Sequence, residues 1–267
     1  MDGSPEARAL KRLSFIVPAA LTLAAGSFSA PASAQGVDEF GAYGGLEDRK
    51  VQESGQSTAV EIRIGRYVPN VDDEFDNGAT PYEDSFGDGD RFLFGVEVDW
   101  QLLRIPYLGT LAPGLGWGFT KSSGDALLQD GTGRSDQTTS LTIMPMYLVG
   151  VLRADVIARE TLVPLVPYAK LGLGGALWWV SDGDDTARTD SGISGRGTSY
   201  GYQFALGGML LLDFFDPSAA VEADNSIGVN NSYLFGEWYY SDLGGFGSGD
   251  SMQVGTNTWM LGLALEI

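Results

Sequence analysis

The feature that most constrains the fold of this chain is an alternation of apolar and polar residues that recurs between Thr58 and Ile267. The second alternating segment shows it best, with Phe92, Phe94, Val96, Val98, Trp100 and Leu102 set against Arg91, Gly95, Glu97, Asp99 and Gln101. Successive side chains of a strand point to opposite faces of the sheet, so a period of two residues predicts β-strands.

Eight segments alternate in this way, separated by stretches rich in Gly, Asp, Ser and Pro. We predict connections at one end of the sheet over residues 69–90, 122–137, 181–198 and 243–254, and at the other end over 105–110, 154–164 and 214–230. An even number of strands places both termini at the same end of a closed antiparallel barrel. Pro145 interrupts the fourth segment and predicts a local disruption, because proline donates no ladder hydrogen bond. The sequence DPSAAVEAD, which begins at Asp216, predicts a helical turn.

The two faces of the segments differ in character. One carries large aliphatic and aromatic residues, and in the fourth segment this face is predicted to hold Leu141, Ile143, Tyr147, Val149 and Val151. The other is rich in glycine and carries Glu61, Arg63, Glu97, Asp99, Lys170, Gln203, Glu237 and Glu266. A glycine-rich face suits the narrow interior of a barrel, where charges can pair, better than a surface in water. We therefore predict a lumen ion network, and a soluble lipocalin-type barrel is the alternative.

The aromatic residues gather at strand ends. Trp100 and Phe214 fall at one end of the predicted barrel, and at the other end lie Phe92, Phe94, Trp117, Phe119, Trp179, Tyr200, Tyr202, Trp238, Tyr240 and Trp259. Rings of Trp, Tyr and Phe at both ends of the strands are typical of proteins whose strands cross a bilayer.

The N-terminal region has the pattern of an export signal. Arg8, Lys11 and Arg12 precede an apolar run from Leu13 to Ala25, and the sequence ASA at 32–34 is a signal-peptidase site. We predict a cleaved signal peptide over residues 1–34, a flexible periplasmic leader over 35–57 and a barrel over 58–267. The chain has no cysteine and hence no lipid-anchoring site of the lipobox type.

Net charge and hydropathy exclude further classes of protein. The net charge of −19 argues against nucleic acid as a partner, since phosphate binding needs a basic surface. After the signal, no apolar run is long enough for a membrane helix of about 20 residues. A membrane location then requires a closed barrel, which satisfies every backbone hydrogen bond. The prediction is an all-β, eight-stranded antiparallel up-and-down transmembrane β-barrel in the cell outer membrane of a Gram-negative bacterium.

Six stretches of the sequence are distinctive: GRYVPNVDDEF, PYEDSFG, VDWQLLRIPYLGTLAPGLGWGFT, PYAKLGLGGALWW, ALGGMLLLDFFDPSAA and YLFGEWYYSDLGGF. These stretches resemble a family of small outer-membrane β-barrels found in myxobacteria and their relatives. The resemblance extends from about Glu61 to Ile267 and implies a barrel of the OmpA, OmpX and OmpW size class without enzymatic activity. Barrels of that kind usually end in Phe or Trp, whereas this chain ends in Ile267.

The absence of histidine and cysteine excludes Ser-His, Asp-His and thiolate chemistry. Lys170 in a Ser–Lys pair, or the carboxylate pair of Glu97 and Asp99, is the remaining catalytic alternative to the lumen ion network. The ion network is favoured, so we predict no enzyme and no cofactor. The carboxylates of the loops favour a solvated surface, with binding of Ca²⁺ or bridging to lipopolysaccharide through divalent ions as the alternatives. They include Asp72, Asp73, Glu74, Asp76, Glu83, Asp84, Asp88, Asp90, Asp182, Asp184 and Asp185. Arg66 and Lys121 fall on the lipid-facing side near the outer rim and are predicted to contact lipopolysaccharide phosphates. Arg104 and Arg153 are predicted to face lipid at the inner rim and to extend toward headgroups.

The function predicted from these features is that of a non-enzymatic outer-membrane protein with a structural or surface-interaction role. The alternative is a narrow, porin-like channel or carrier for small solutes, which the glycine-lined interior favours. Predicted partners are outer-membrane lipid, lipopolysaccharide and, during biogenesis, the barrel-assembly machinery. The sequence does not decide the oligomeric state.

Overall fold

The computed structural model describes residues 57–75, 77–87, 89, 91–127, 133–161, 163–183, 185–187, 194–247 and 251–267. The predicted signal peptide and all of the predicted leader except residue 57 lie outside these residues. Among the residues described, no helix has the length and apolar character needed to span a bilayer.

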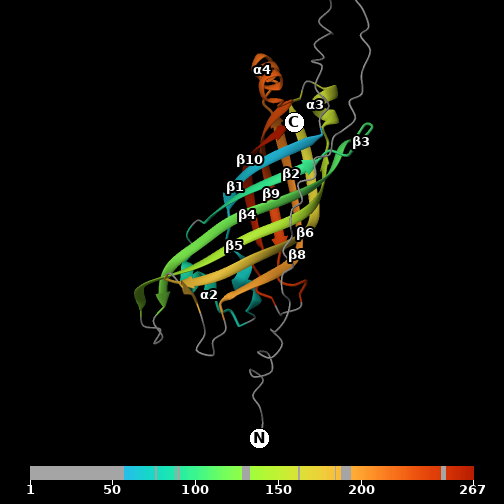
Figure 1. Cartoon of the computed structure of the whole chain (residues 1–267). Coiled ribbons are helices and arrows are strands. Elements are labelled where there is room, and N and C mark those ends of the chain that lie inside the picture. The colour runs from blue at the N-terminus through green and yellow to red at the C-terminus, as the bar shows by residue number, and fades with distance from the viewer. Residues whose placement is uncertain are drawn as a thin grey trace, which may run out of the picture. The chain divides into compact units, whose positions relative to one another are not determined.

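Eight antiparallel strands close into a barrel, which confirms the predicted fold class (Figure 1). In spatial order around the barrel they are β1 (Thr58–Arg66), β2 (Phe92–Trp100), β4 (Gly109–Leu127), β5 (Arg134–Arg153), β6 (Leu165–Asp182), β8 (Arg196–Leu211), β9 (Asn231–Asp242) and β10 (Thr256–Glu266). The last strand pairs with the first, with Val60 opposite Leu265 and Ile64 opposite Leu261. Two short strands, β3 (Leu103–Ile105) and β7 (Asp185–Thr186), extend hairpins beyond the closed wall.

The first and last residues of the barrel lie together, since the Thr58 N–H donates to the Ile267 carbonyl at 3.1 Å. We call this the terminal end, which is uppermost in Figure 1, and the opposite one the loop end. At the loop end, the β1–β2 connection lies against the β9–β10 connection: the Asn70 N–H donates to the Gly255 carbonyl at 2.8 Å, and the Thr256 hydroxyl donates to the Val68 carbonyl at 2.8 Å.

Several predicted connections contain regular structure. The segment 69–90 holds a 3₁₀ helix, η1 (Asn70–Glu74), and helix α2 (Pro81–Phe86), while α3 (Val156–Glu160) lies in 154–164. The predicted helical turn is the longer helix α4 (Pro217–Ile227), which begins with an Asp216 cap on the Ala219 N–H and ends at Gly228 in the left-handed region. The prediction of a loop over 122–137 was wrong in extent, because β4 continues to Leu127 and β5 begins at Arg134.

The large apolar side chains of most strands point away from the barrel axis and are exposed. They include Ile62, Ile64, Phe92, Phe94, Leu115, Phe119, Leu148, Leu171, Leu173, Leu206, Leu234, Trp259, Leu261 and Leu263. We call this surface the outward belt. The charged residues Glu61, Arg63, Glu97, Asp99, Lys170 and Glu237 point inward and are buried. A barrel folded for water would reverse these two faces, so the arrangement disfavours the lipocalin-type alternative.

The predicted orientation of the fourth segment was wrong. In β5 the side chains of Ile143, Tyr147, Val149 and Val151 are buried, whereas Met146 and Leu148 are exposed. Both faces of this strand are apolar, so its alternation could not show which one turns inward. The reason lies on the neighbouring strand β4: a Cβ at Gly116 would collide with the Tyr147 ring, and one at Gly114 would lie 3.0 Å from Val149 Cγ2.

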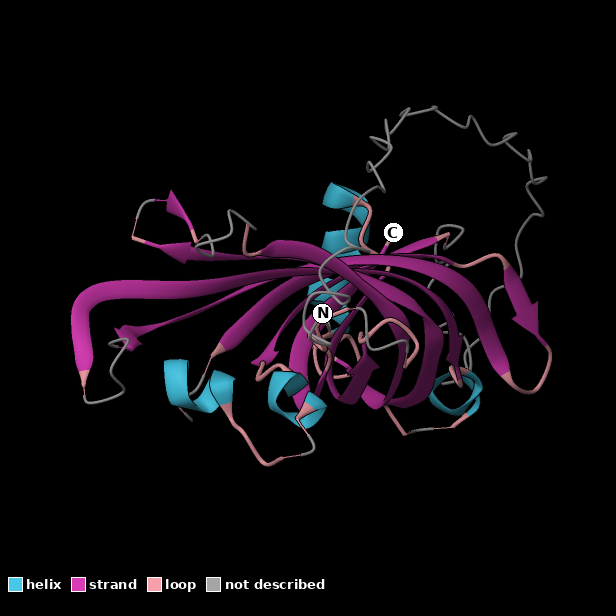
Figure 2. Ribbon diagram, turned by 90° about the horizontal axis from the view of Figure 1, so that it is seen from below, coloured by secondary structure: helices cyan, strands magenta, loops and turns pink. Residues whose placement is uncertain are grey.

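Pro145 produces the predicted local disruption without a change of register. Trp117 pairs with Met146 and Thr120 with Ile143, and the two positions between them are not paired across the β4–β5 seam. On its other side Pro145 still pairs with Ala176 of β6. Figure 2 shows how the strands tilt around the barrel and how the long β4–β5 hairpin extends past it. The register irregularity of this hairpin lies farther out, between Asp125 and Leu127.

Candidate functional site

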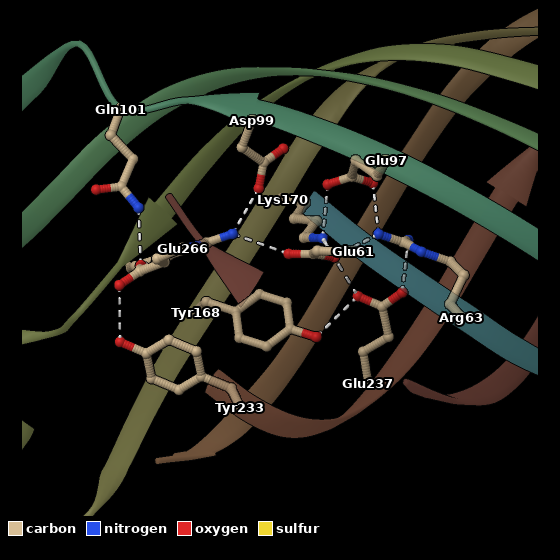
Figure 3. Close-up of polar contacts among 11 residues, drawn as sticks. Glu61, Arg63, Glu97, Asp99, Gln101, Tyr168, Lys170, Tyr233, Glu237 and Glu266 are labelled. Carbon is tan, nitrogen blue, oxygen red and sulfur yellow. Dashed lines mark hydrogen bonds and ion pairs between the residues drawn. The ribbon is translucent and has the colours of Figure 1, made fainter. Parts of the chain in front are cut away.

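A cluster of charged side chains occupies the barrel interior toward the terminal end (Figure 3). At its centre, Lys170 of β6 donates to Glu61 at 2.6 Å and to Glu97 at 2.7 Å. Arg63 of β1 donates to the same two carboxylates at 2.6 Å each and to Glu237 of β9 at 2.8 Å. These contacts join strands β1, β2, β6 and β9 across the lumen, and the side chains involved are at most 2% exposed.

Arg153 of β5 supplies a third buried cation. Its guanidinium donates to Asp99 at 2.6 Å, to Glu61 at 2.9 Å and to Glu266 at 3.1 Å. The prediction that Arg153 faces lipid was therefore wrong, for the same reason as in the rest of β5: the inward face of this strand is the one that carries odd-numbered residues. The inward position of Arg153 could have been predicted from the sequence, because inward carboxylates outnumber inward cations on the other seven strands.

Glu266 of β10 also has neutral hydrogen-bond donors around it. It accepts hydrogen bonds from Gln101 Nε2 at 2.7 Å and from Asn231 Nδ2 and the Tyr233 hydroxyl, each at 3.0 Å. Glu237 similarly accepts from the Tyr168 hydroxyl at 2.9 Å. Buried charges are stable in a protein only when they are paired and hydrogen-bonded. The neutral donors therefore supply hydrogen bonds to carboxylate oxygens that the three cations leave without a partner.

The structure thus brings together all seven residues predicted to form the ion network: Glu61, Arg63, Glu97, Asp99, Lys170, Glu237 and Glu266. Gln203, also predicted to face inward, lies farther toward the loop end and accepts from the Tyr239 hydroxyl at 2.9 Å. The arrangement ties opposite walls of the barrel to each other.

Side chains fill the rest of the interior. The half toward the loop end is occupied by apolar residues, among them Tyr67, Leu93, Ile143, Tyr239, Leu243 and Met260. Next to Arg63, Gly118 and Tyr147 is a cavity of about 10 Å³, which is about the smallest volume that holds one water molecule. The glycines of the lumen do not line an open path, because aromatic side chains such as Tyr147, Tyr168 and Phe235 occupy the space beside them.

Among the residues that the structure describes, one group of carboxylates is close enough to share an ion: oxygens of Glu61, Glu97 and Asp99 lie within 4.8 Å of one another. The ammonium group of Lys170 already bridges Glu61 and Glu97. A divalent cation there would have to displace an internal cation, so this group does not fit a metal site.

Two of the predicted acidic loop residues, Asp72 and Glu74, accept hydrogen bonds from backbone N–H groups at the loop end. Asp72 accepts from the backbone N–H groups of Tyr82 at 2.7 Å and Glu83 at 3.0 Å and thereby ties η1 to the start of α2. Glu74 accepts a hydrogen bond from the Gln253 N–H. Partial burial of the Glu74 carboxyl raises its pKa and outweighs the opposite effect of this hydrogen bond. Asp76, Asp88, Asp90 and Asp184 lie outside the described residues.

The two predicted lipopolysaccharide contacts lie at the loop end of β1 and β4, the two strands that flank β2. Arg66 is the last residue of β1 and pairs with Phe92 of β2. Lys121 of β4 follows Thr120, which pairs with Leu93, so Phe92 lies between the two cations in one row across the sheet. Both basic side chains are exposed, and two strand spacings put their backbones about 10 Å apart.

Comparisons with known proteins add similarity of fold only. The attachment invasion locus protein Ail of Yersinia pestis has a TM-score of 0.40 and 13% identity, covering 81% of this chain and 100% of Ail. The N-terminal β-barrel domain of Pseudomonas aeruginosa OprF has a TM-score of 0.36 and 13% identity, covering 80% of this chain and 100% of that domain. No protein-family model matches the chain, and no curated protein matches it. The resemblance to a myxobacterial family stays a prediction.

Proposed function

We propose that this protein is a non-enzymatic integral outer-membrane β-barrel whose filled interior makes it a rigid support for its surface loops. The observation that carries the proposal is the outward belt of leucine, isoleucine and aromatic side chains around a charged, buried interior. Exposed apolar patches on soluble monomers rarely exceed a few hundred Å². An apolar belt around the whole barrel fits a protein surrounded by the hydrocarbon of a bilayer. In this arrangement the loop end faces the cell exterior.

The filled lumen favours a structural or surface-interaction role over the channel alternative. An eight-stranded barrel has an interior just wide enough for side chains to fill. Here Arg63, Arg153 and Lys170 tie the walls together, and an apolar layer that includes Tyr239, Leu243 and Met260 covers the half toward the loop end. Passage of a solute would require both layers to move.

Cell fractionation combined with gel mobility tests the membrane assignment. We expect the mature protein in the outer-membrane fraction, soluble only with detergent, and migrating differently when unheated and heated in dodecyl sulfate, because the closed barrel resists unfolding. A mature chain that stays folded and monodisperse in buffer without detergent would contradict the proposal. Chain without the predicted signal peptide, refolded into detergent, serves as the reference for the two mobilities.

Planar-bilayer recording separates the structural role from the channel. We expect no steady openings from the purified barrel, since the ion cluster and the apolar layer close the lumen. Steady openings that disappear when Lys170 and Glu97 are replaced by methionine and glutamine would instead establish the channel.

Lipopolysaccharide retention tests the proposed contact at the loop end. Replacing Arg66 and Lys121 with glutamine removes two exposed cations that flank Phe92, and charge-assisted hydrogen bonds to phosphate are about twice as strong as neutral ones. We expect less lipopolysaccharide to co-purify with the double variant. Arg159→Gln, at the terminal end, is the matched control and should retain the wild-type amount; equal retention by both variants would contradict the contact.

A further inference from the structure

Two groups of exposed apolar side chains continue the outward belt past the barrel wall at the terminal end. The first, which we call the hairpin foot, is formed by Leu102, Leu103, Tyr107 and Leu108 around the β3–β4 turn. The second, the phenylalanine foot, is formed by Phe214 and Phe215 after β8. Tyr107 is 89% exposed, Leu102 75% and Phe215 64%, so these side chains contribute little to the packing of the barrel.

The two feet lie on opposite sides of the barrel. The hairpin foot connects β2 with β4, and the phenylalanine foot lies between β8 and β9. Two strands, β5 and β6, separate them on one side of the ring, and β1 and β10 separate them on the other. Figure 1 shows β3 and α4, the elements next to each foot, diverging at the terminal end.

Each foot is held in a defined conformation. In the hairpin foot, Leu103 pairs with Leu111, and Tyr107 has a φ of 64°, a left-handed conformation that costs free energy for a bulky residue. In the phenylalanine foot, the Phe215 N–H donates to the Leu212 carbonyl at 2.9 Å, and the two rings meet edge to face with centroids 5.5 Å apart. The turn is tied to β9 because Asp213 accepts from the Ser232 hydroxyl at 2.6 Å.

The chemistry of both feet fits a lipid surface. Along β4 the outward side chains of Phe119, Leu115 and Leu111 lead without interruption to the hairpin foot, so both surfaces face the same solvent. The hairpin also carries the exposed side chain of Arg104. Apolar residues accompanied by Tyr and Arg are typical of the headgroup boundary, where a ring is half solvated and an arginine extends toward phosphate.

We propose that the two feet insert into the boundary between headgroups and acyl chains of the leaflet at the terminal end and thereby fix the depth and tilt of the barrel. This inference rests on the proposed membrane location. Two contacts on opposite sides of a barrel resist tilting in the plane that contains them, which a single contact cannot do.

The chain contains no cysteine, so single cysteines carrying an environment-sensitive fluorophore can test the proposal. The variants are Tyr107→Cys and Phe215→Cys for the feet, Leu263→Cys for the outward belt, and Glu160→Cys and Asn225→Cys as exposed polar controls on α3 and α4. Each is reconstituted in vesicles of phosphatidylethanolamine and phosphatidylglycerol. Quenching is measured with aqueous iodide and with lipids brominated near the headgroup.

We expect labels at both feet to lose iodide quenching and to gain bromolipid quenching relative to the two controls. Labels at the feet that respond like the controls, while the Leu263 label is protected from iodide, overturn this inference alone. A Leu263 label that iodide quenches freely overturns the proposed membrane location as well. In a Tyr107→Ser/Phe215→Ser background, a label at Leu265 should become more accessible to iodide, and unchanged accessibility would contradict the role in depth and tilt.

Discussion

Replacing Arg63 with methionine should lower the free energy of unfolding by about 3–5 kcal/mol, the cost typical of removing one partner of a buried ion pair. The guanidinium donates to Glu61, Glu97 and Glu237, all of which are fully buried. Methionine fills a similar volume but leaves these carboxylates with Lys170 and Arg153 as the remaining cations of the cluster. Five carboxylates already outnumber three cations inside the barrel, so removing Arg63 leaves more carboxylates without a cationic partner.

Urea titration of the barrel in lipid vesicles, followed by the mobility difference between folded and unfolded chain, measures this effect. Arg159→Met is the matched control: Arg159 forms an ion pair with Asp155 at 3.0 Å but is 42% exposed, and such pairs contribute about 0–1 kcal/mol. Equal midpoints for the two variants would mean that the interior cluster is hydrated and does not hold the walls together.

Replacing Gly262 with valine should destabilise the barrel by about 1–3 kcal/mol or more, the range for overpacking a filled interior. A Cβ at this position of β10 would collide with the Ile62 carbonyl of β1 and with the Phe235 ring of β9. Gly262 pairs with Arg63 across the seam where the last strand meets the first. The valine side chain therefore fits only if the closing strands β1 and β10 separate or if Phe235 moves away from the charged cluster.

Gly208→Val provides the control for this prediction. Gly208 lies in β8, and a Cβ built there has no atom within 4 Å. We expect unfolding of this variant close to wild type, since a β-branched residue suits a strand position that has open space for its side chain. The same urea titration compares the two variants, and refolding yield in detergent reports whether the seam closes. Gly262→Val with an unchanged midpoint and yield would show that the seam has room for a side chain.

The sequence by itself determined the class of fold. Eight alternating segments, polar connections and glycine on one face predicted the closed antiparallel barrel and the inward position of Glu61, Arg63, Lys170 and Glu237, because the period of a strand fixes which residues share a face. Where one parity was plainly apolar, as in β2 or β10, its direction could be inferred. The helical turn after Asp216 was also predicted, and the structure extends it to the helix α4.

Only the tertiary structure decided the orientation of β5. Both parities of that strand are apolar, and what turns Tyr147 and Val149 inward is the space left by Gly114 and Gly116 on β4, a complementarity between strands that no single segment contains. The same rotation brings Arg153 into the lumen, where it pairs with Asp99 and Glu266. Periodicity fixes faces within a strand, whereas packing and charge balance between strands fix which face is inside.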